Sequence, residues 1–214
     1  MASMSVVVAT STERRDDIVA RYAERAGAGV HRGSEEDVLG RMYDAAVAAD
    51  ADVVVRATAD NPLIPPAVVD RVVDAVSGPD GANYAGNTLE KTFPLGLIAE
   101  AFDRESFETV EARSTKPHQR EHVTQYYHEH PDSFVLENVD WSDVYDWEPP
   151  LGADEVRLTL DEADDYELLR AVYEGVPVDE RGIVSAREAL QFVADNDLAG
   201  TNLHVEQPAV TKDE

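Results

Sequence analysis

Two short runs each carry an aspartate at the end of a predicted strand, and the positions of these aspartates suggest a metal and phosphate site. One run, RATADNPLI at residues 56–64, follows a valine triplet, and the other, RLTLDEADD, occupies residues 157–165. Each is predicted to be a strand that stops at its aspartate, since Pro62 cannot donate to a ladder and a helical pattern begins directly after Asp161. In open α/β sheets, ligands collect outside the carboxyl ends of the strands. Mg²⁺ takes one or two carboxylates together with phosphate oxygens and water, so Asp60 and Asp161 are predicted to be its ligands.

Each aspartate also has a simpler interpretation. Asp161 opens an acidic segment that continues as a helix, so it could be a helix N-cap favoured by the helix dipole. Asp60, followed by asparagine and proline, could be the first residue of an Asx-turn. Taken one at a time, the aspartates do not separate these interpretations, whereas their joint placement at strand ends favours the metal site.

Length and composition indicate one large α/β domain. The 214 residues are enough to bury a substantial core, and we expect a single domain over residues 1–205 followed by a mobile acidic tail at 206–214. The chain has no apolar run long enough for a transmembrane helix, no signal-peptide pattern at its start and no cysteine. These features predict a cytoplasmic protein without disulfides or a thiolate nucleophile.

The formal net charge is −26, from 44 acidic and 18 basic residues, of which only Lys91, Lys116 and Lys212 are lysines. A field of this sign repels nucleic acids and anionic membranes, so neither is an expected partner. The acidic residues are spread along the chain, which favours adaptation to a high-salt cytoplasm over a docking surface for a basic partner. In molar salt the Debye length falls to about 3 Å, and a strongly charged surface stays soluble.

Strand and helix patterns alternate along the chain, which is typical of a mostly parallel sheet covered by helices on both faces. Ser34 is predicted as the N-cap of the second helix, which runs to residue 49. Residues 83–103 are expected to be extended, with a loop at 93–96. Strands are otherwise expected at 5–10, 30–34, 52–58, 134–139 and 156–160, and helices at 16–26, 66–76, 104–112, 119–130, 163–173 and 185–196.

Several runs in this order resemble one family, the cytidylyltransferases of the spore-coat-polysaccharide and CMP-Kdo or CMP-acylneuraminate synthetase type. The resemblance extends from residue 6 to about residue 202, and it implies a Rossmann-like nucleotide-diphospho-sugar transferase fold. The runs RGSEEDVL and REHVT are fairly specific, while DNPLI is shared more widely among nucleotidyltransferases. The runs are VVAT at 7–10, RGSEEDVL at 32–39, RATADNPLI at 56–64, NT at 87–88 with FP at 93–94, REHVT at 120–124 and TLD at 159–161.

The resemblance implies roles for particular residues. Asp60 and Asp161 would be the catalytic pair that holds Mg²⁺ against the triphosphate and the sugar. Nucleotide binding is implied for Thr10, Arg32, Gly33, Ser34 and Arg56, and substrate binding for Asn87, Thr88, Arg120, Glu121 and His122. His122 could act as a base, although a structural hydrogen bond is the more ordinary role of a single helix histidine. The family also implies a homodimer.

One expected element does not occur in this sequence. Relatives begin with a strand and a glycine- and arginine-containing loop that cradles the CTP phosphates, whereas this chain starts at what resembles their second strand. The first β-α unit is therefore expected to be missing, which would leave neighbouring strands with unpaired backbone groups. A misassigned start or a fragment, a separate polypeptide that supplies the unit, and an inactive paralogue are the three explanations.

The predicted function is transfer of CMP from CTP to a sugar acid, such as a Kdo-like, sialic-acid-like or related nonulosonic acid, with release of pyrophosphate for surface polysaccharide or glycan synthesis. Two alternatives stay open. The chain could be an inactive paralogue or a nucleotide- or sugar-binding subunit that uses the same pocket as a scaffold. It could also be a nucleotide-sugar-dependent glycosyltransferase, although the Asp-x-Asp spacing common in such enzymes is not visible near Asp60.

Overall fold

The computed structural model describes residues 4–78 and 80–205. These residues cluster into two compact units. Unit 1 comprises residues 4–54 and 103–135, and unit 2 comprises residues 55–102, apart from residue 79, and 136–205. The single domain over residues 1–205 stays a prediction, and the predicted tail at 206–214 lies outside the described residues.

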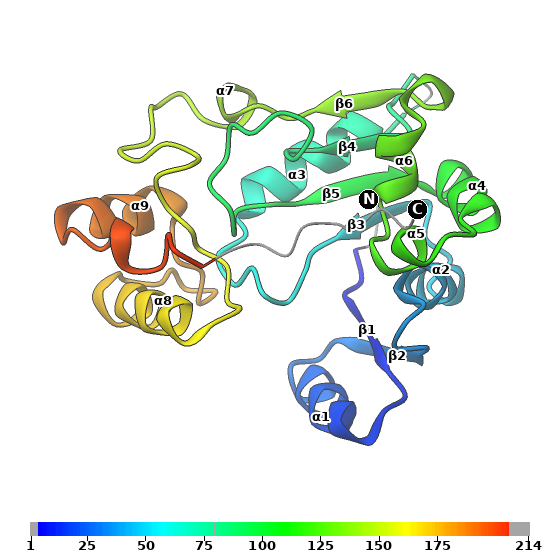
Figure 1. The fold of residues 1–214 in the computed structure, drawn as a ribbon, viewed down its shortest axis with the longest axis horizontal. Helices are drawn as coiled ribbons and strands as arrows, with labels where there is room; N and C mark the ends of the chain where they lie inside the picture. The colour runs from blue at the N-terminus through cyan, green and yellow to red at the C-terminus, as the bar shows by residue number, and fades with distance from the viewer. Residues whose placement is uncertain (1–3, 79, 206–214) are drawn as a thin grey trace. The chain divides into compact units, whose positions relative to one another are not determined.

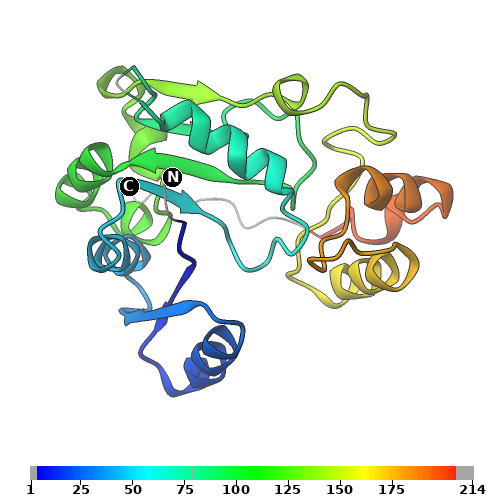
Figure 2. The same ribbon diagram turned by 180° about the vertical axis from the view of Figure 1, so that it is seen from behind.

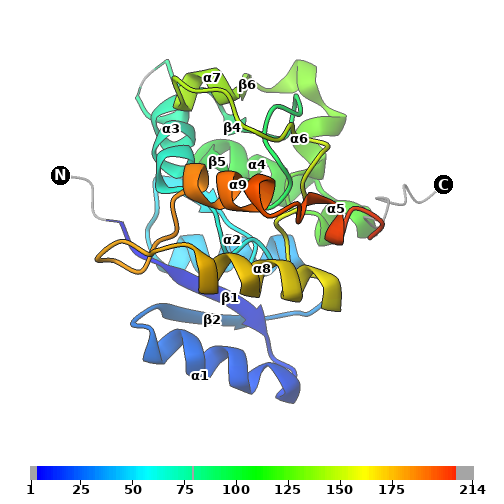
Figure 3. The same cartoon turned by 90° about the vertical axis from the view of Figure 1, so that its left-hand side faces the viewer.

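Unit 1 contains a parallel pair of strands with helices packed against it. β1 (Val7–Ser11) pairs with β2 (Gly29–Gly33), which places Thr10 opposite Arg32. The connection between them consists of the 3₁₀ helix η1 (Arg14–Asp16) and α1 (Asp17–Arg25), and α2 (Val38–Ala48) follows β2. Both helices pack against the pair, and α1 can be followed beside β2 in Figure 3. A crossover of this kind is what parallel pairing requires.

The rest of unit 1 is helical. Asp103 caps α4 (Arg104–Arg113) by accepting from the Ser106 amide at 2.8 Å. α5 (Pro117–Glu121), α6 (Gln125–Glu129) and the 3₁₀ helix η2 (Pro131–Ser133) follow. The helices α4 and α5 pack on α2 and enclose an apolar core. Its fully buried members include Leu39, Phe107, Val110, Val123 and Tyr127.

The larger sheet has the strand order β3-β5-β4-β6. Its strands are β3 (Val53–Arg56), which crosses from unit 1 into unit 2, β4 (Tyr84–Gly86), β5 (Glu100–Asp103) and β6 (Leu136–Asn138). β4 runs parallel to β6 and antiparallel to β5, so the sheet is mixed. Figures 1 and 2 show α3 (Pro66–Val76) lying along β4 and β5. The contact buries Val68 and Val72 of α3 completely.

Three further helices complete unit 2. α7 (Trp141–Val144) follows β6, and its Trp141 packs among Phe93, Tyr145 and Trp147. α8 (Ala163–Gly175) and α9 (Ala186–Asp195) pack against each other, as Figure 3 shows, and the 3₁₀ helix η3 (Ala199–Thr201) follows. Asn202, directly after η3, has a fully buried side chain.

Three local predictions were wrong. The helix predicted over 119–130 is two helices, because His122 leaves the helical region and the β-branched Val123 turns into the core. The N-cap of α2 is Asp37 rather than Ser34, since Asp37 Oδ1 accepts from the Gly40 amide at 2.9 Å. Residues 156–160 form no strand, and only an isolated parallel bridge joins Arg157 to Leu95. Leu158 N donates to Leu95 O and Leu160 N donates to Asp60 O, so the run pairs with two separate loops.

The predicted fold class is confirmed: the chain is an α/β protein with parallel strand pairs and interleaved helices. Within the described part of the chain, no helix is long and apolar enough to cross a membrane.

Candidate functional site

The structure brings Asp60 and Asp161 together in unit 2. Asp60 lies four residues beyond the end of β3, and its carbonyl oxygen accepts from Leu160 N at 2.7 Å and from Thr159 Oγ1 at 3.2 Å. The run that leads to Asp161 is therefore bonded directly to the turn that carries Asp60. Asp60 Oδ1 is buried and has no hydrogen-bond partner among the described residues. Because a buried carboxylate oxygen normally has a donor, Asp60 Oδ1 is suited to accept a hydrogen bond from a ligand or to coordinate a metal ion.

Asp161 is held from two sides. Its Oδ2 accepts from Arg157 Nη2, and its amide donates to Asp165 Oδ2 at 2.9 Å. The N-cap of α8 is Glu162, so the simpler interpretation of Asp161 as the helix N-cap is wrong. The Asp161 side chain is 46% exposed, which leaves part of its carboxylate accessible.

Asp165 is the centre of this support, and it is completely buried. Its carboxylate accepts from Arg157 Nε at 3.1 Å, from Asn202 Nδ2 at 2.7 Å and from two backbone amides. Burial alone would raise the pKa of Asp165, but hydrogen bonds from Arg157, the two amides and Asn202 outweigh it, so the pKa is lowered. Asp165 therefore remains an anion that fixes the Arg157 guanidinium.

A second buried network holds Arg56 at the end of β3. Arg56 Nη1 donates to Glu100 Oε2 at 2.5 Å, and the Tyr84 hydroxyl donates to Glu100 Oε1 at 2.7 Å. The same hydroxyl lies 2.9 Å from Thr88 Oγ1, so two predicted binding residues, Arg56 and Thr88, share one network. Burial, reinforced by the charge of Glu100, raises the pKa of Tyr84 well above its usual range and keeps it a donor to Glu100.

Asn87, predicted to bind the sugar, is buried directly after β4. Its Nδ2 donates to Leu97 O at 2.8 Å, and its Oδ1 accepts from Ala99 N at 3.0 Å. The side chain therefore ties the end of β4 to the segment that enters β5. In this position Asn87 supports the loop that carries Thr88.

The nucleotide residues predicted in unit 1 lie along the end of the β1–β2 pair. Thr10 is buried opposite Arg32, and the Arg32 guanidinium donates to Ser11 O, Glu13 O and Asp17 Oδ1 at 2.8, 2.9 and 2.6 Å. Arg32 thereby ties β2 to η1 and α1. Ser34 Oγ accepts from the Asp37 amide at 3.1 Å, and a side chain at Gly33 would approach Arg41 Cγ to 3.0 Å.

Arg120, predicted in the sugar pocket, is fully engaged inside unit 1. It forms a two-point ion pair with Asp37, Nε to Oδ1 at 2.7 Å and Nη2 to Oδ2 at 2.6 Å, and it also bonds to Glu111. These partners raise the pKa of Arg120, and the hydrogen bonds that Arg120 donates to Asp37 are the largest cause. Glu121 is exposed, and His122 is the C-cap of α5. In these positions Arg120 joins α5 to the start of α2.

Comparison with known proteins identifies the family. The profile of the cytidylyltransferase family matches residues 2–178. This chain is a member of the cytidylyltransferase family. The spore coat polysaccharide biosynthesis protein SpsF of Bacillus subtilis is 30% identical over 198 residues, covering 92% of this chain and 78% of that protein. An uncharacterised protein of Methanocaldococcus jannaschii is 33% identical over 184 residues, or 84% of this chain and 71% of its own.

A solved cytidylyltransferase structure supports the same assignment. The enzyme from Leptospira borgpetersenii superposes with a TM-score of 0.82 at 27% identity, covering 94% of this chain and 81% of that one. The predicted Rossmann-like nucleotidyltransferase fold is therefore confirmed, and so is the resemblance on which it depended.

The residues present suit a divalent cation in this cytidylyltransferase. Asp60 and Asp161 lie on runs that are bonded directly to each other, and Asp60 has a buried carboxylate oxygen without a hydrogen-bond donor in the described part of the chain. Mg²⁺ takes one or two such carboxylates together with phosphate oxygens and water. Among the described residues, no group of three or more histidine, cysteine, aspartate or glutamate side chains could hold a metal without help. A metal at this position would therefore complete its coordination with water or with substrate oxygens.

The sequence prediction missed the residues that support these sites. Arg157 and Asp165 lie in the same run as Asp161, spaced four residues apart on either side of it, and that spacing could have indicated their pairing. Glu100 is the only acidic residue in the apolar run LGLIAEAF at 95–102, which indicates a buried partner. Asn202 carries no sequence signal, because its partners lie about forty residues away.

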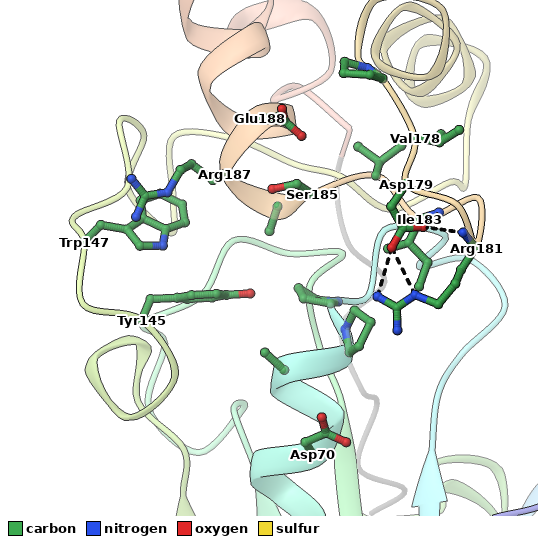
Figure 4. Close-up of a pocket in the computed structure, with 16 residues that line it drawn as sticks. Asp70, Tyr145, Trp147, Val178, Asp179, Arg181, Ile183, Ser185, Arg187 and Glu188 are labelled. Carbon is green, nitrogen blue, oxygen red and sulfur yellow. Dashed lines mark hydrogen bonds and ion pairs between the residues drawn. The ribbon is translucent and has the colours of Figure 1, made fainter.

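Unit 2 also contains a hollow of about 700 Å³ between the starts of α3 and α9, shown in Figure 4. Trp147 and Tyr145 line it, and none of the predicted site residues does. Its two arginines already have partners: Arg187 stacks on Trp147 at 4.3 Å, and Arg181 pairs with Asp179 at 2.9 Å. Among the described residues that line the hollow, no arginine or lysine is therefore left unpaired for an anionic substrate.

Proposed function

We propose that this protein transfers CMP from CTP to a sugar acid of the Kdo, sialic or related nonulosonic class, releasing pyrophosphate. The observation that carries the proposal is the direct bonding of the Asp60 turn to the run ending in Asp161, in a chain of the cytidylyltransferase family. SpsF, named for spore coat polysaccharide biosynthesis, supports a role in the synthesis of a surface polysaccharide or glycan.

The reaction needs no nucleophilic side chain. A hydroxyl of the sugar attacks the α-phosphorus of CTP, a new P–O bond forms, the bond to the pyrophosphate oxygen breaks, and the hydroxyl proton leaves to solvent or to a base. Asp60 and Asp161 would hold Mg²⁺, which neutralises the charge that develops on the phosphates. Arg56, fixed by Glu100, would donate to an anionic group of a substrate.

Other parts of the proposal follow from composition and family. The protein is proposed to work in a cytoplasm of high salt, because its formal charge is −26. CTP and a small sugar acid are its proposed partners, with a second copy of the chain as a homodimer, and neither nucleic acid nor membrane is a proposed partner.

The test is pyrophosphate release with CTP, MgCl₂ and a panel of sugar acids in molar KCl, with the product identified by mass spectrometry. UTP and ATP in place of CTP test the nucleotide. We expect CMP–sugar formation with CTP, and its loss in Asp60→Asn. Tight CTP binding without pyrophosphate release would instead favour the binding-subunit alternative. Hydrolysis of a supplied nucleotide sugar would favour the glycosyltransferase.

A further inference from the structure

We propose that Arg157 is a positioning residue that orients the Asp161 carboxylate toward a divalent cation, and that Asp165 and Asn202 fix Arg157 for this purpose. The inference rests on the proposed function, because it concerns the same carboxylate pair. It assigns three residues that lie outside the predicted site.

The hydrogen-bond geometry divides the Asp161 carboxylate into two different oxygens. Arg157 Nη2 donates to Oδ2, whereas no hydrogen bond among the described residues joins Oδ1. The Asp161 amide is fixed at the same time by Asp165 Oδ2 at 2.9 Å. With backbone and one oxygen both held, Oδ1 has a defined direction. Outer-shell groups that hold a metal-ligating carboxylate in this way commonly orient it.

Arg157 is itself held more firmly than an ordinary surface arginine. Its side chain is only 5% exposed, and its Nε donates to the completely buried Asp165 at 3.1 Å. Asn202 Nδ2 bonds both to Arg157 O at 3.0 Å and to Asp165 Oδ1 at 2.7 Å, which joins the segment after η3 to the pair. A buried charge of this kind persists only with a partner, and Asp165 is that partner.

The charge balance shows why Asp165 matters for a cation. Arg157 alone beside Asp161 would cancel the charge that attracts a metal ion. Asp165 cancels the charge of Arg157 instead, so the cluster of Asp60, Asp161, Arg157 and Asp165 keeps a net charge of about −2 and can still attract a divalent cation.

The orientation account and the charge-repulsion account predict opposite changes in cation affinity when the Arg157 guanidinium alone is removed. If Arg157 acted only through its positive charge, its loss would strengthen cation binding. If Arg157 orients Asp161, its loss weakens binding, by the tenfold to hundredfold typical of outer-shell substitutions. When Arg157 and Asp165 are removed together the net charge of the cluster is unchanged, so a loss of affinity supports orientation and an unchanged affinity supports the charge account.

The experiment measures Mn²⁺ binding to the full chain by titration calorimetry and by Mn²⁺ electron paramagnetic resonance, at constant KCl. Arg157→Gln alone leaves Asp165 buried without a counter-charge, so the main variant is Arg157→Gln with Asp165→Asn, which removes both charges with amides of similar shape. Arg157→Lys keeps the charge but loses the planar fork. Arg170→Gln on α8, which removes an exposed arginine paired with Glu167, is the matched control.

We expect Mn²⁺ affinity to fall at least tenfold in the double variant and in Arg157→Lys, with thermal melting still cooperative and Arg170→Gln unchanged. The Mg²⁺ concentration for half-maximal pyrophosphate release should rise more than kcat at saturating Mg²⁺ falls. Equal or tighter Mn²⁺ binding in either folded variant overturns the inference and leaves the proposed function standing. Failure of the unaltered protein to bind Mn²⁺ overturns both the inference and the metal site of the proposed function.

Discussion

Arg56 Nη1 and Glu100 Oε2 lie 2.5 Å apart at the end of β3, and the Glu100 side chain is only 4% exposed. Tyr84 bonds the other Glu100 oxygen at 2.7 Å. Arg56 is therefore a guanidinium whose direction is fixed before any substrate arrives. Among the described residues, its Nε and Nη2 form no hydrogen bond. A preorganised donor of this kind loses little freedom on binding an anion.

We predict that Glu100→Gln weakens binding of the substrate anion. The amide keeps the shape of Glu100 but loses the charge-assisted bond, and a bond to a charged group is worth about 1.5–3 kcal/mol. KM for CTP or for the sugar acid should rise about tenfold or more, measured by pyrophosphate release at varied concentrations of each.

Glu137→Gln is the control for this substitution, because Glu137 also pairs with an arginine, Arg71, but is 38% exposed. It should leave both KM values unchanged. If Glu100→Gln folds and keeps both KM values, Arg56 does not act on a substrate anion.

Comparison of the predicted with the observed helices and strands shows what the sequence could predict. The periodic segments were predictable: α3 begins and ends as expected, and α8 begins as expected, because an apolar period and a proline or acidic start act locally. Residues 156–160 were predicted as a strand but form none. Alternating apolar residues indicate that a segment is buried, but they do not indicate which segment it hydrogen-bonds to. Its partners, Leu95 and Asp60, lie in loops that only the tertiary fold places beside it.

The same distinction applies to the candidate site. Asp60 and Asp161 could be predicted to lie near each other from their positions after apolar runs, and their role as metal ligands stays a prediction. The partners of Arg120, Asp37 and Glu111, could not, because long-range ion pairs leave no periodic signal. The prediction that Arg120 binds the sugar stays a prediction, and the contacts seen here give it a structural role as well.

Gly96 is predicted to tolerate no side chain. Its φ is +100°, and a Cβ there would lie 2.3 Å from Leu158 C and 2.4 Å from Leu158 O. Gly96→Ala must therefore displace the run that leads to Asp161, in addition to straining its own backbone. We expect a loss of about 3 kcal/mol or more in the free energy of unfolding, measured by denaturant titration.

Gly182→Ala separates the two effects at Gly96. Gly182 has a similar φ of +82°, but a Cβ there meets nothing within 4 Å. Backbone strain alone should cost about 1–2 kcal/mol. Equal losses in the two variants would mean that the contact with Leu158 is unimportant.

Arg120→Lys is predicted to destabilise the protein by about 2 kcal/mol. Lysine keeps the charge but cannot form the two-point pair with Asp37 and reach Glu111 as well. Arg104→Lys is the comparison, because Arg104 pairs with Asp50 at a site where Asp50 is 92% exposed, and it should cost clearly less than Arg120→Lys. Chemical denaturation at pH 7 measures both, and similar values would show that the Arg120 pairs contribute no more than a surface pair.

Glu129 should make stability depend on pH in the acidic range. Burial alone would raise the pKa of Glu129, but hydrogen bonds from Gln119, His118 and Gln125 outweigh it and lower the pKa from 4.5 to about 2. Because the folded-state pKa is the lower one, the contribution is complete above pH 4.5 and is lost as the pH falls toward 2. It amounts to about 3 kcal/mol, and the side chain is only 13% exposed.

Denaturant titrations between pH 2.5 and 7 would check this prediction. Glu129→Gln should be less stable than the unaltered protein at pH 7, and the difference should shrink steadily below about pH 4.5. Glu108→Gln, on an exposed position of α4, should follow the unaltered protein throughout. A difference between Glu129→Gln and the unaltered protein that stays constant over the whole range would mean that Glu129 titrates normally.

The charge of −26 predicts that salt stabilises the fold. Self-repulsion among dispersed carboxylates disfavours the compact state, and salt screens it as the Debye length falls from about 10 Å at 0.1 M to about 3 Å at 1 M. The ion pairs described above are screened as well, but exposed pairs contribute little. The Arg157–Asp165 pair is buried and the Arg56–Glu100 pair is largely buried, so salt screens them less. Repulsion should therefore dominate, and the melting temperature should rise with KCl, most steeply below about 1 M.

Calorimetric melting in KCl and NaCl at equal ionic strength tests this account. Screening depends on ionic strength, so the two salts should raise the melting temperature alike. Sucrose, which is excluded from protein surfaces without screening charge, should give no comparable rise at low ionic strength. A melting temperature that stays level or falls between 0.1 and 1 M KCl would show that attractive pairs balance the repulsion, and the proposed high-salt habitat would lose its physical basis.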